Sequence, residues 1–329
     1  MVKQKKIAFL FPGQGAQYPQ MALDLYQQSK AVQELFALAS EAAGIDLRSL
    51  LEKATAEELK RTDISQPTIS LANLAAASML REEGIEPIAC AGFSLGEYAA
   101  LAYTGVVSYE DCFKLVTARG KAMQKVADRL ASAEAGSAPG MAAVLGLPGE
   151  QVEALIAEWK QGGLTDLYGA NFNSPKQVVI AGTASALAQA DERFKAAGAR
   201  RVIRLQVAGP FHSPLVADAL EDFAPLLEGT SFHDPKIPLF SNVTGKAVHS
   251  GMEAKKLALR QITEPVRWTS EEAQLAEFGL DAVLEVGPGK VLQGLWKDSG
   301  SAIPAFGAGT STDIASVLTA LGQADNRTN

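Results

Sequence analysis

The chain has 329 residues, 47% of them hydrophobic, and its 37 acidic and 30 basic residues give a formal net charge of −7. This length and composition predict a soluble globular protein with a substantial core, built as one large domain or two smaller ones. The negative charge argues against general nucleic-acid binding but leaves room for a local basic patch.

No apolar run approaches the ~20 residues that cross a bilayer, so no membrane association is expected. The first residues, MVKQKKIAFLFPGQG, lack the cleavage pattern of a signal peptide, and we therefore expect a cytoplasmic protein. The two cysteines, Cys90 and Cys112, both lie in apolar periodic segments. This setting favours core positions over a disulfide or a metal cage, and no metal site is expected.

Two short apolar runs in the first part of the chain each end at a turn. IAFLF, at 7–11, leads into PGQG and predicts a buried strand that enters a loop. A helical region then extends to about Leu80, and PIACAGF, at 87–93, predicts a second buried strand. LGEYAALAYTG follows it and predicts a helix that closes at Gly105.

A capping box formed by Ser108 and Asp111 predicts the start of the next helix. Its apolar side chains recur on one stripe, at Cys112, Val116, Met123 and Val126. Arg119 interrupts this stripe, and a buried cation needs an anion. The helix alone leaves three answers open: a carboxylate of the protein, water reached by snorkelling, or an anionic substrate in a cleft. The two structural answers are favoured at this point.

The segment ASAEAGSAPG, at 131–140, breaks all periodicity and predicts a boundary loop. The following elements, up to about residue 207, have the order β-α-β-β-α-β, which is the ferredoxin-like pattern. Later apolar segments, IPLFSNVT, AVLEVG and IPAF, alternate with helical stretches and predict a resumed parallel sheet with helices on both faces. We therefore expect a large α/β subdomain at 1–130 and 208–321, a small subdomain inserted at 131–207, and a disordered tail at 322–329.

Ser94 lies in GFSLG, where the predicted strand gives way to a helix. In Gly-x-Ser-x-Gly, the glycines allow a tight strand-to-helix turn that exposes the serine near helical N–H groups, where an oxyanion is stabilised. An ordinary strand-to-helix turn is the alternative. A serine nucleophile needs a base, and His212 in VAGPFHSPL follows a predicted strand, whereas His233 and His249 lie in polar turns. A loop histidine that only caps backbone groups is the alternative for His212.

The chain resembles the malonyl-CoA:acyl-carrier-protein transacylases and the related acyltransferase domains of polyketide synthases. Seven segments carry the resemblance, in the family's order and nearly end to end: FPGQGAQ, GFSLGEYAAL, RGKAMQ, NFNSPKQVVIAG, GPFHSP, QITEPVRWT and EVGPGKVL. The resemblance implies a large α/β-hydrolase-like subdomain with a mostly parallel sheet and an inserted ferredoxin-like subdomain. It also implies ping-pong transfer of malonyl from malonyl-CoA to the phosphopantetheine thiol of acyl carrier protein in fatty acid synthesis.

Carried over residue by residue, the resemblance makes Ser94 the nucleophile and His212 its base. It implies that the main-chain carbonyl of Gln261 orients the histidine, so that the pair is a dyad without an aspartate. The oxyanion hole would be the N–H groups of Gln14 and Leu95. The remaining implied residues are Arg119, whose planar fork matches the malonyl carboxylate, and the pocket residues Phe93, Met123, Asn171 and Phe211.

One position departs from the family pattern: Phe93 stands where histidine is usual, which puts any substrate-positioning role of that histidine in doubt. Phe211 resembles the malonyl-selective polyketide members, because a bulky ring there would crowd a branched acyl group. The resemblance implies no cofactor, a monomer, and a carrier-protein partner. Because carrier proteins of this type are acidic, we expect a basic docking face, with candidates Lys121, Lys125, Lys195, Arg200, Arg201 and Arg204.

Three other functions compete with this one. A stand-alone acyltransferase of polyketide synthesis would carry the same motifs. A serine esterase or thioesterase would also carry Gly-x-Ser-x-Gly, but with an acid as third triad member and an oxyanion loop such as HGGG, which does not occur. A non-enzymatic docking domain would be expected to have lost Ser94, His212 or Arg119, and all three are present.

Overall fold

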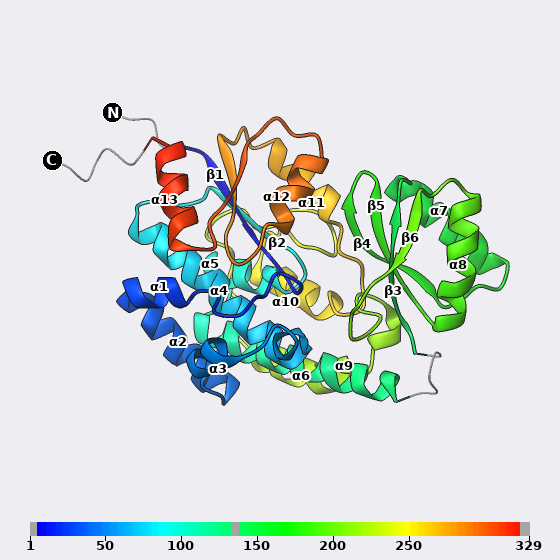
Figure 1. Cartoon of the computed structure of the whole chain (residues 1–329), viewed down its shortest axis with the longest axis horizontal. Coiled ribbons are helices and arrows are strands. Elements are labelled where there is room, and N and C mark those ends of the chain that lie inside the picture. The colour runs from blue at the N-terminus through cyan, green and yellow to red at the C-terminus, as the bar shows by residue number, and fades with distance from the viewer. Residues whose placement is uncertain (1–4, 133–137, 323–329) are drawn as a thin grey trace.

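Two four-stranded sheets organise the chain, and the computed structural model describes residues 5–132 and 138–322 (Figure 1). The first sheet is parallel throughout, with the order β2-β1-β7-β8. Its strands are β1 (Ile7–Phe11), β2 (Ala89–Gly92), β7 (Ala282–Glu285) and β8 (Ala305–Gly307). The α/β class and the mostly parallel sheet expected from the sequence are confirmed.

The central strand β1 is buried on both faces because its side chains alternate between two separate cores. Ile7, Phe9 and Phe11 join the larger core, whereas Ala8 and Leu10 join the core on the opposite face. This alternation follows from the two-residue period of a strand and explains why IAFLF is apolar at every position.

Helices cover both faces of the parallel sheet. The larger core receives side chains from most of them: α1 (Leu23–Gln28), α2 (Lys30–Ala43), α3 (Leu47–Lys53), α4 (Thr62–Glu82), α5 (Gly96–Tyr103), α6 (Tyr109–Ala131), α9 (Ala219–Gly229), α10 (Gly251–Arg260) and α13 (Ser311–Ala320). The opposite face is covered by α11 (Trp268–Ala276) and α12 (Val291–Asp298). Short 3-10 turns lie at Glu58–Lys60 and Pro214–Val216.

Helix α6 carries the interrupted stripe, and the expected capping box opens it. The Ser108 hydroxyl accepts the N–H of Asp111 at 2.9 Å and donates to its carboxylate at 2.7 Å. The stripe residues are all buried, and so is Arg119. Next to it, Gly120 lets α6 approach α4 closely, since a Cβ there would lie 2.9 Å from the carbonyl oxygen of Thr62.

The second sheet is antiparallel and has the order β4-β5-β3-β6 (Figure 1). Its elements follow in chain order as β3 (Gly140–Leu145), α7 (Gly149–Gln161), β4 (Leu167–Ser174), β5 (Gln177–Gly182), α8 (Ala184–Ala196) and β6 (Arg201–Arg204). This β-α-β-β-α-β unit is the ferredoxin-like arrangement. One face packs under α7 and α8, and the other turns Met141 and Val179 toward the large core.

The inserted unit begins after α6 and ends beyond β6. The expected limit at 131 is the last residue of α6, and the expected limit at 207 falls in the segment that follows β6. Those limits themselves stay a prediction. Two expected features lie largely outside the described residues. These are half of the boundary loop, at 133–137, and all but the first residue of the tail, at 323–329.

One expected strand is wrong. The segment IPLFSNVT forms only isolated bridges, between Leu239 and Cys90 and between Phe240 and Ala247. Ser241 and Asn242 in this segment are buried, and the side chain of Asn242 forms a hydrogen bond with the Gly92 carbonyl next to the serine turn. No helix among the described residues has the length and apolarity needed to cross a membrane.

Candidate active site

Ser94 occupies the turn between β2 and α5 with a left-handed backbone, at φ 50°. The two flanking glycines are sterically required. A Cβ on Gly92 would lie 2.1 Å from the Gly96 carbonyl carbon, and a Cβ on Gly96 would lie 1.9 Å from the carbonyl oxygen of Phe11. The sharp turn therefore depends on both glycines, and it presents the serine hydroxyl at the carboxyl end of the sheet.

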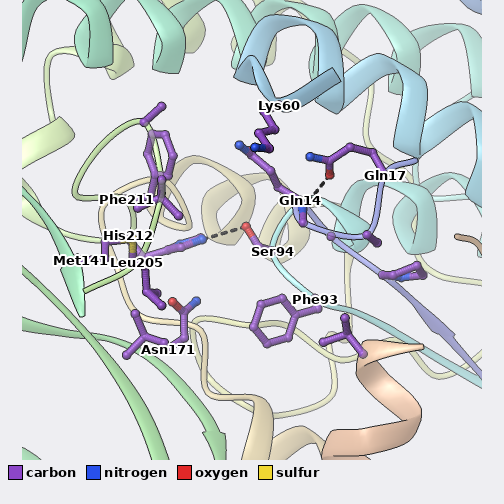
Figure 2. Close-up of a pocket in the computed structure, with 18 of the residues that line it drawn as sticks. Gln14, Gln17, Lys60, Phe93, Ser94, Met141, Asn171, Leu205, Phe211 and His212 are labelled. Atoms are coloured by element: carbon purple, nitrogen blue, oxygen red, sulfur yellow. Dashed lines mark hydrogen bonds between the residues drawn. The ribbon is translucent and has the colours of Figure 1, made fainter. Parts of the chain in front are cut away.

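Ser94 and His212 are in direct hydrogen-bond contact, as Figure 2 shows by a dashed line. The distance from Ser94 Oγ to His212 Nε2 is 2.7 Å, and His212 Nδ1 lies 2.8 Å from the main-chain oxygen of Gln261. Because a carbonyl oxygen only accepts, Nδ1 carries the ring proton in the neutral imidazole and Nε2 accepts the serine proton. This is the geometry of a serine and its general base.

The environment of His212 keeps its imidazole neutral. Burial, and next to it the positive charge of Arg119, lower the pKa of His212 to about 4. At neutral pH the ring is therefore ready to accept the Ser94 proton. His233 and His249 are exposed and do not line the cavity.

Two backbone N–H groups next to the serine are without an acceptor. Among the described residues, neither the Gln14 nor the Leu95 N–H donates a hydrogen bond. The Ser94 N–H is already used, because it donates to Asn242 Oδ1 at 2.7 Å. The PGQG loop that carries Gln14 is anchored from below, where Asn73 Nδ2 donates to the Pro12 carbonyl at 2.9 Å.

Arg119 reaches the same cavity from α6 and is 1% exposed. Its Nη2 donates to Gln261 Oε1 at 3.1 Å and lies 3.5 Å from Ser94 Oγ. It forms no salt bridge with any residue that the structure describes, and its buried Nε has no hydrogen-bond partner there. Burial lowers the pKa of Arg119, while Tyr98 and Glu97 oppose the shift. With 1% exposure the guanidinium does not snorkel to the surface, and Glu97 acts on it without a direct salt bridge, so Arg119 lies at the cavity with no directly paired carboxylate among the described residues.

A cavity of about 630 Å³ opens over the dyad, between the two sheets. The four expected pocket residues, Phe93, Met123, Asn171 and Phe211, all line it. Figure 2 shows Phe211, Met141 and Leu205 on the His212 side and Gln14, Gln17 and Lys60 on the opposite side. The cavity thus combines the serine of the large subdomain with walls from the small one.

Phe93, which stands where the family usually has histidine, packs edge to face on Trp268, with ring centroids 5.4 Å apart. Its ring lies beside Ser94 and offers no polar atom to a ligand (Figure 2).

A buried polar network below the serine turn was not expected from the sequence. Asn242 accepts from Ser94, and its Nδ2 donates to the Gly92 carbonyl at 2.7 Å and to Glu271 at 2.8 Å. Glu97, 3% exposed, accepts from Gln261 Nε2 at 2.5 Å. Burial raises the pKa of Glu97 to about 7. Only the placement of a carboxylate in the small apolar helix GEYAALAY could have signalled this network.

No cluster of three or more metal-ligating side chains occurs within 5–132 and 138–322. Both cysteines are free and buried, as expected of core residues.

The family model for the acyl transferase domain matches residues 8–319. The malonyl CoA-acyl carrier protein transacylase of Haemophilus influenzae is 40% identical over 296 residues, which are 89% of this chain and 92% of that protein. The protein of the same name from Bacillus subtilis is 38% identical over 293 residues, with coverages of 89% and 90%.

Solved structures agree with this similarity. The malonyl CoA-acyl carrier protein transacylase of Clostridium perfringens superposes with a TM-score of 0.89 at 34% identity, over 97% of this chain and 98% of that one. A malonyl-transacylase solved in complex with a type II polyketide acyl-carrier protein superposes with a TM-score of 0.86 at 36% identity, over 96% and 99%.

Proposed function

The chain belongs to the acyl transferase domain family, and we infer that it is an acyltransferase that moves malonyl from malonyl-CoA to the phosphopantetheine thiol of an acyl carrier protein. The observation that carries this inference is the meeting of three groups in one cavity. Ser94 and His212 form a nucleophile–base pair, and an arginine that forms no salt bridge with any described residue lies 3.5 Å from the serine oxygen.

In the first half-reaction, His212 Nε2 takes the hydroxyl proton while Ser94 Oγ attacks the thioester carbonyl carbon of malonyl-CoA. The free N–H groups of Gln14 and Leu95 are suited to stabilise the oxyanion that forms. The carbon–sulfur bond then breaks, the imidazolium returns its proton to the CoA sulfur, and a malonyl-Ser94 ester remains.

In the second half-reaction, the carrier-protein thiol takes the place of CoA. His212 accepts the thiol proton, the sulfur attacks the ester carbonyl, and the proton passes to Ser94 Oγ as the carbon–oxygen bond breaks. Both steps use the same base and the same N–H groups, so transfer needs no further catalytic residue. The main-chain carbonyl of Gln261 keeps Nε2 facing the serine throughout.

Selection of malonyl is assigned to Arg119 and Phe211. The guanidinium offers two parallel hydrogen bonds to the free carboxylate of the acyl group. Phe211 lines the cavity beside the base and restricts the room for a branch on the acyl chain.

The histidine contact also bears on the esterase alternative. His212 Nδ1 bonds to a main-chain carbonyl, where a serine esterase of the hydrolase type would have an aspartate or glutamate. The dyad therefore favours transfer between thioesters over that class.

Fatty acid synthesis is the proposed pathway. A stand-alone acyltransferase of polyketide synthesis is the alternative, because a malonyl-transacylase with a type II polyketide carrier protein is matched over 99% of its length. Malonyl-CoA carries its acyl group as an activated thioester and the carrier protein supplies a free thiol, so we propose no additional cofactor. A cytoplasmic monomer remains the prediction for location and assembly.

The test is covalent labelling. Malonyl-CoA alone, without carrier protein, should add one malonyl group to the intact protein, and Ser94→Ala should stay unlabelled in mass spectrometry. An unmodified wild-type mass under conditions where transfer proceeds would exclude the ester intermediate.

A further inference from the structure

A buried carboxylate lies behind the arginine that faces the cavity, and the mechanism above does not use it. Glu97, in the first turn of α5, is 3% exposed. Its Oε2 accepts from Gln261 Nε2 at 2.5 Å and from the Asn242 N–H at 3.2 Å. Burying a carboxylate is costly, so its contacts at this position call for a role.

The side-chain amide of Gln261 separates Glu97 from Arg119. Its Nε2 faces three acceptors, which are Glu97 Oε2, the Ser94 carbonyl at 3.0 Å and Asn242 Oδ1 at 3.2 Å. Its Oε1 on the other side accepts from Arg119 Nη2 at 3.1 Å. The amide thus bridges the two residues: its NH₂ group donates to Glu97, and its oxygen accepts from Arg119.

The orientation of this amide decides whether Arg119 is held. A guanidinium only donates, so it is bound by Oε1 and repelled by the NH₂ group. Glu97 contributes an acceptor at the opposite end, which makes the flipped amide unfavourable on both sides. In this arrangement Arg119 is fixed by a neutral oxygen, and it forms no salt bridge with a described residue.

We propose that Glu97 is a positioning residue for substrate selection: through the Gln261 amide it aims Arg119 at the acyl carboxylate while leaving the guanidinium fork free to bind it. This proposal rests on the proposed function, in which Arg119 binds malonyl. A direct Glu97–Arg119 ion pair would occupy the fork and compete with the substrate, and the intervening amide prevents this.

The experiment compares Glu97→Met, which removes the acceptor at similar size, with Glu97→Gln, which keeps an oxygen that can face Gln261. We measure kcat/KM for malonyl-CoA and for acetyl-CoA, which lacks the second carboxylate, and follow folding by circular dichroism. The malonyl-to-acetyl ratio should fall about tenfold or more in Glu97→Met. Glu97→Gln should restore most of it, because the acceptor and not the charge orients the amide.

A second variant removes the bridge itself. Gln261→Leu keeps the main-chain carbonyl on His212 and should lower the ratio as Glu97→Met does, which tests the proposal even if Glu97→Met does not fold. Losses common to both acyl groups, such as those transmitted through Asn242 to Ser94, cancel in the ratio.

The outcomes distinguish a failure of the Glu97 proposal from a failure of the proposed role of Arg119 in malonyl binding. If Arg119→Ala leaves the ratio unchanged, the proposed role of Arg119 fails. If Arg119→Ala lowers the ratio but Glu97→Met and Gln261→Leu reduce both substrates in parallel, Glu97 is merely structural and the proposal is overturned. An equal loss in Glu97→Gln overturns it too. Added to Arg119→Ala, Glu97→Met should change the ratio no further.

Discussion

Ser94 and His212 both hold left-handed backbone conformations, at φ 50° and φ 57°, and their side chains meet at 2.7 Å. Neither is glycine, so each carries steric strain of about 1–3 kcal/mol. The surroundings hold both in place: Asn242 binds the Ser94 N–H, and Ser213 next to the histidine donates its hydroxyl to the Pro210 carbonyl at 2.6 Å. The contact between nucleophile and base therefore depends on two strained turns.

The strain at Ser94 has a measurable effect on stability. Ser94→Ala keeps the Cβ that opposes φ 50°, whereas Ser94→Gly removes it. Both variants should be inactive, and the glycine variant should be more stable than the alanine variant by about 1 kcal/mol in urea unfolding. Equal stability of the two would contradict a strained serine.

Arg119→Ala should change substrate preference more than general activity. Loss of the charge-assisted pair to the malonyl carboxylate should cost on the order of 2–5 kcal/mol, roughly 30- to several-thousand-fold in kcat/KM. Transfer from acetyl-CoA should stay level or improve, and Arg119→Lys should recover part of the malonyl loss, since it supplies charge without the fork. A parallel fall for both acyl groups would return Arg119 to a structural role.

The acylation rate should fall on the acid side only at a pH well below the pKa of an ordinary histidine. Nε2 accepts the serine proton only when unprotonated, and burial and Arg119 lower the pKa of His212 to about 4. Single-turnover acylation should therefore stay level as the pH falls through ~6.5 and drop only near pH ~4. Arg119→Ala removes the positive charge that helps lower the pKa of His212, so in this variant the acid fall of the rate should move to higher pH. A wild-type limb at ~6.5 would refute the buried neutral imidazole.

Carrier-protein docking should depend on the arginines in and just before β6 more than on the lysines. Arg200, Arg201 and Arg204 are exposed and form no salt bridge with a described residue. The segment that follows them, Leu205–Ala208, lines the cavity, so these arginines lie near its rim. Lys195 and Lys125 are already paired, with Asp191 at 2.7 Å and Asp222 at 2.6 Å.

Replacing the three arginines with glutamate should raise the KM for an acidic carrier protein about tenfold at low salt, and less as salt rises. Hydrolysis of malonyl-CoA should be unaffected. Lys195→Glu is the matched control and should have a smaller effect. Similar KM values in the triple variant and the wild type would remove β6 from the docking surface.

Local signals in the sequence were sufficient for much of the fold. The run IAFLF predicted β1 at its observed limits because the cores on both faces of a central strand require apolar side chains. Ser108 marked the start of α6 because a cap acts over three residues. The strand expected at 237–244 failed because an apolar run does not reveal whether a partner edge is available, and only bridges to Cys90 and Ala247 form.

Some residues of the site could also be predicted from the sequence, and others could not. The turn at Ser94 follows from glycines two residues away, and the resemblance supplied Arg119 and Gln261. The carboxylate of Glu97 in a small apolar helix was a signal, but its contact with Asn242 could not be found, because nothing near either residue in the chain reveals the partner. Only the tertiary fold brings the Asn242 N–H to Glu97.

The pairing of β1 with β7 also sets the order in which the chain can fold as it is synthesised. Ile7 pairs with Ala282, so the parallel sheet is incomplete until the chain beyond residue 282 has left the ribosome. The antiparallel sheet needs only residues 140–204 and closes through pairings within that stretch. The inserted unit is therefore expected to form first, while the apolar strands β1 and β2 still lack their partner β7. The long-range pairing with β7 should then limit the folding rate, and until it forms the nascent chain is exposed to aggregation.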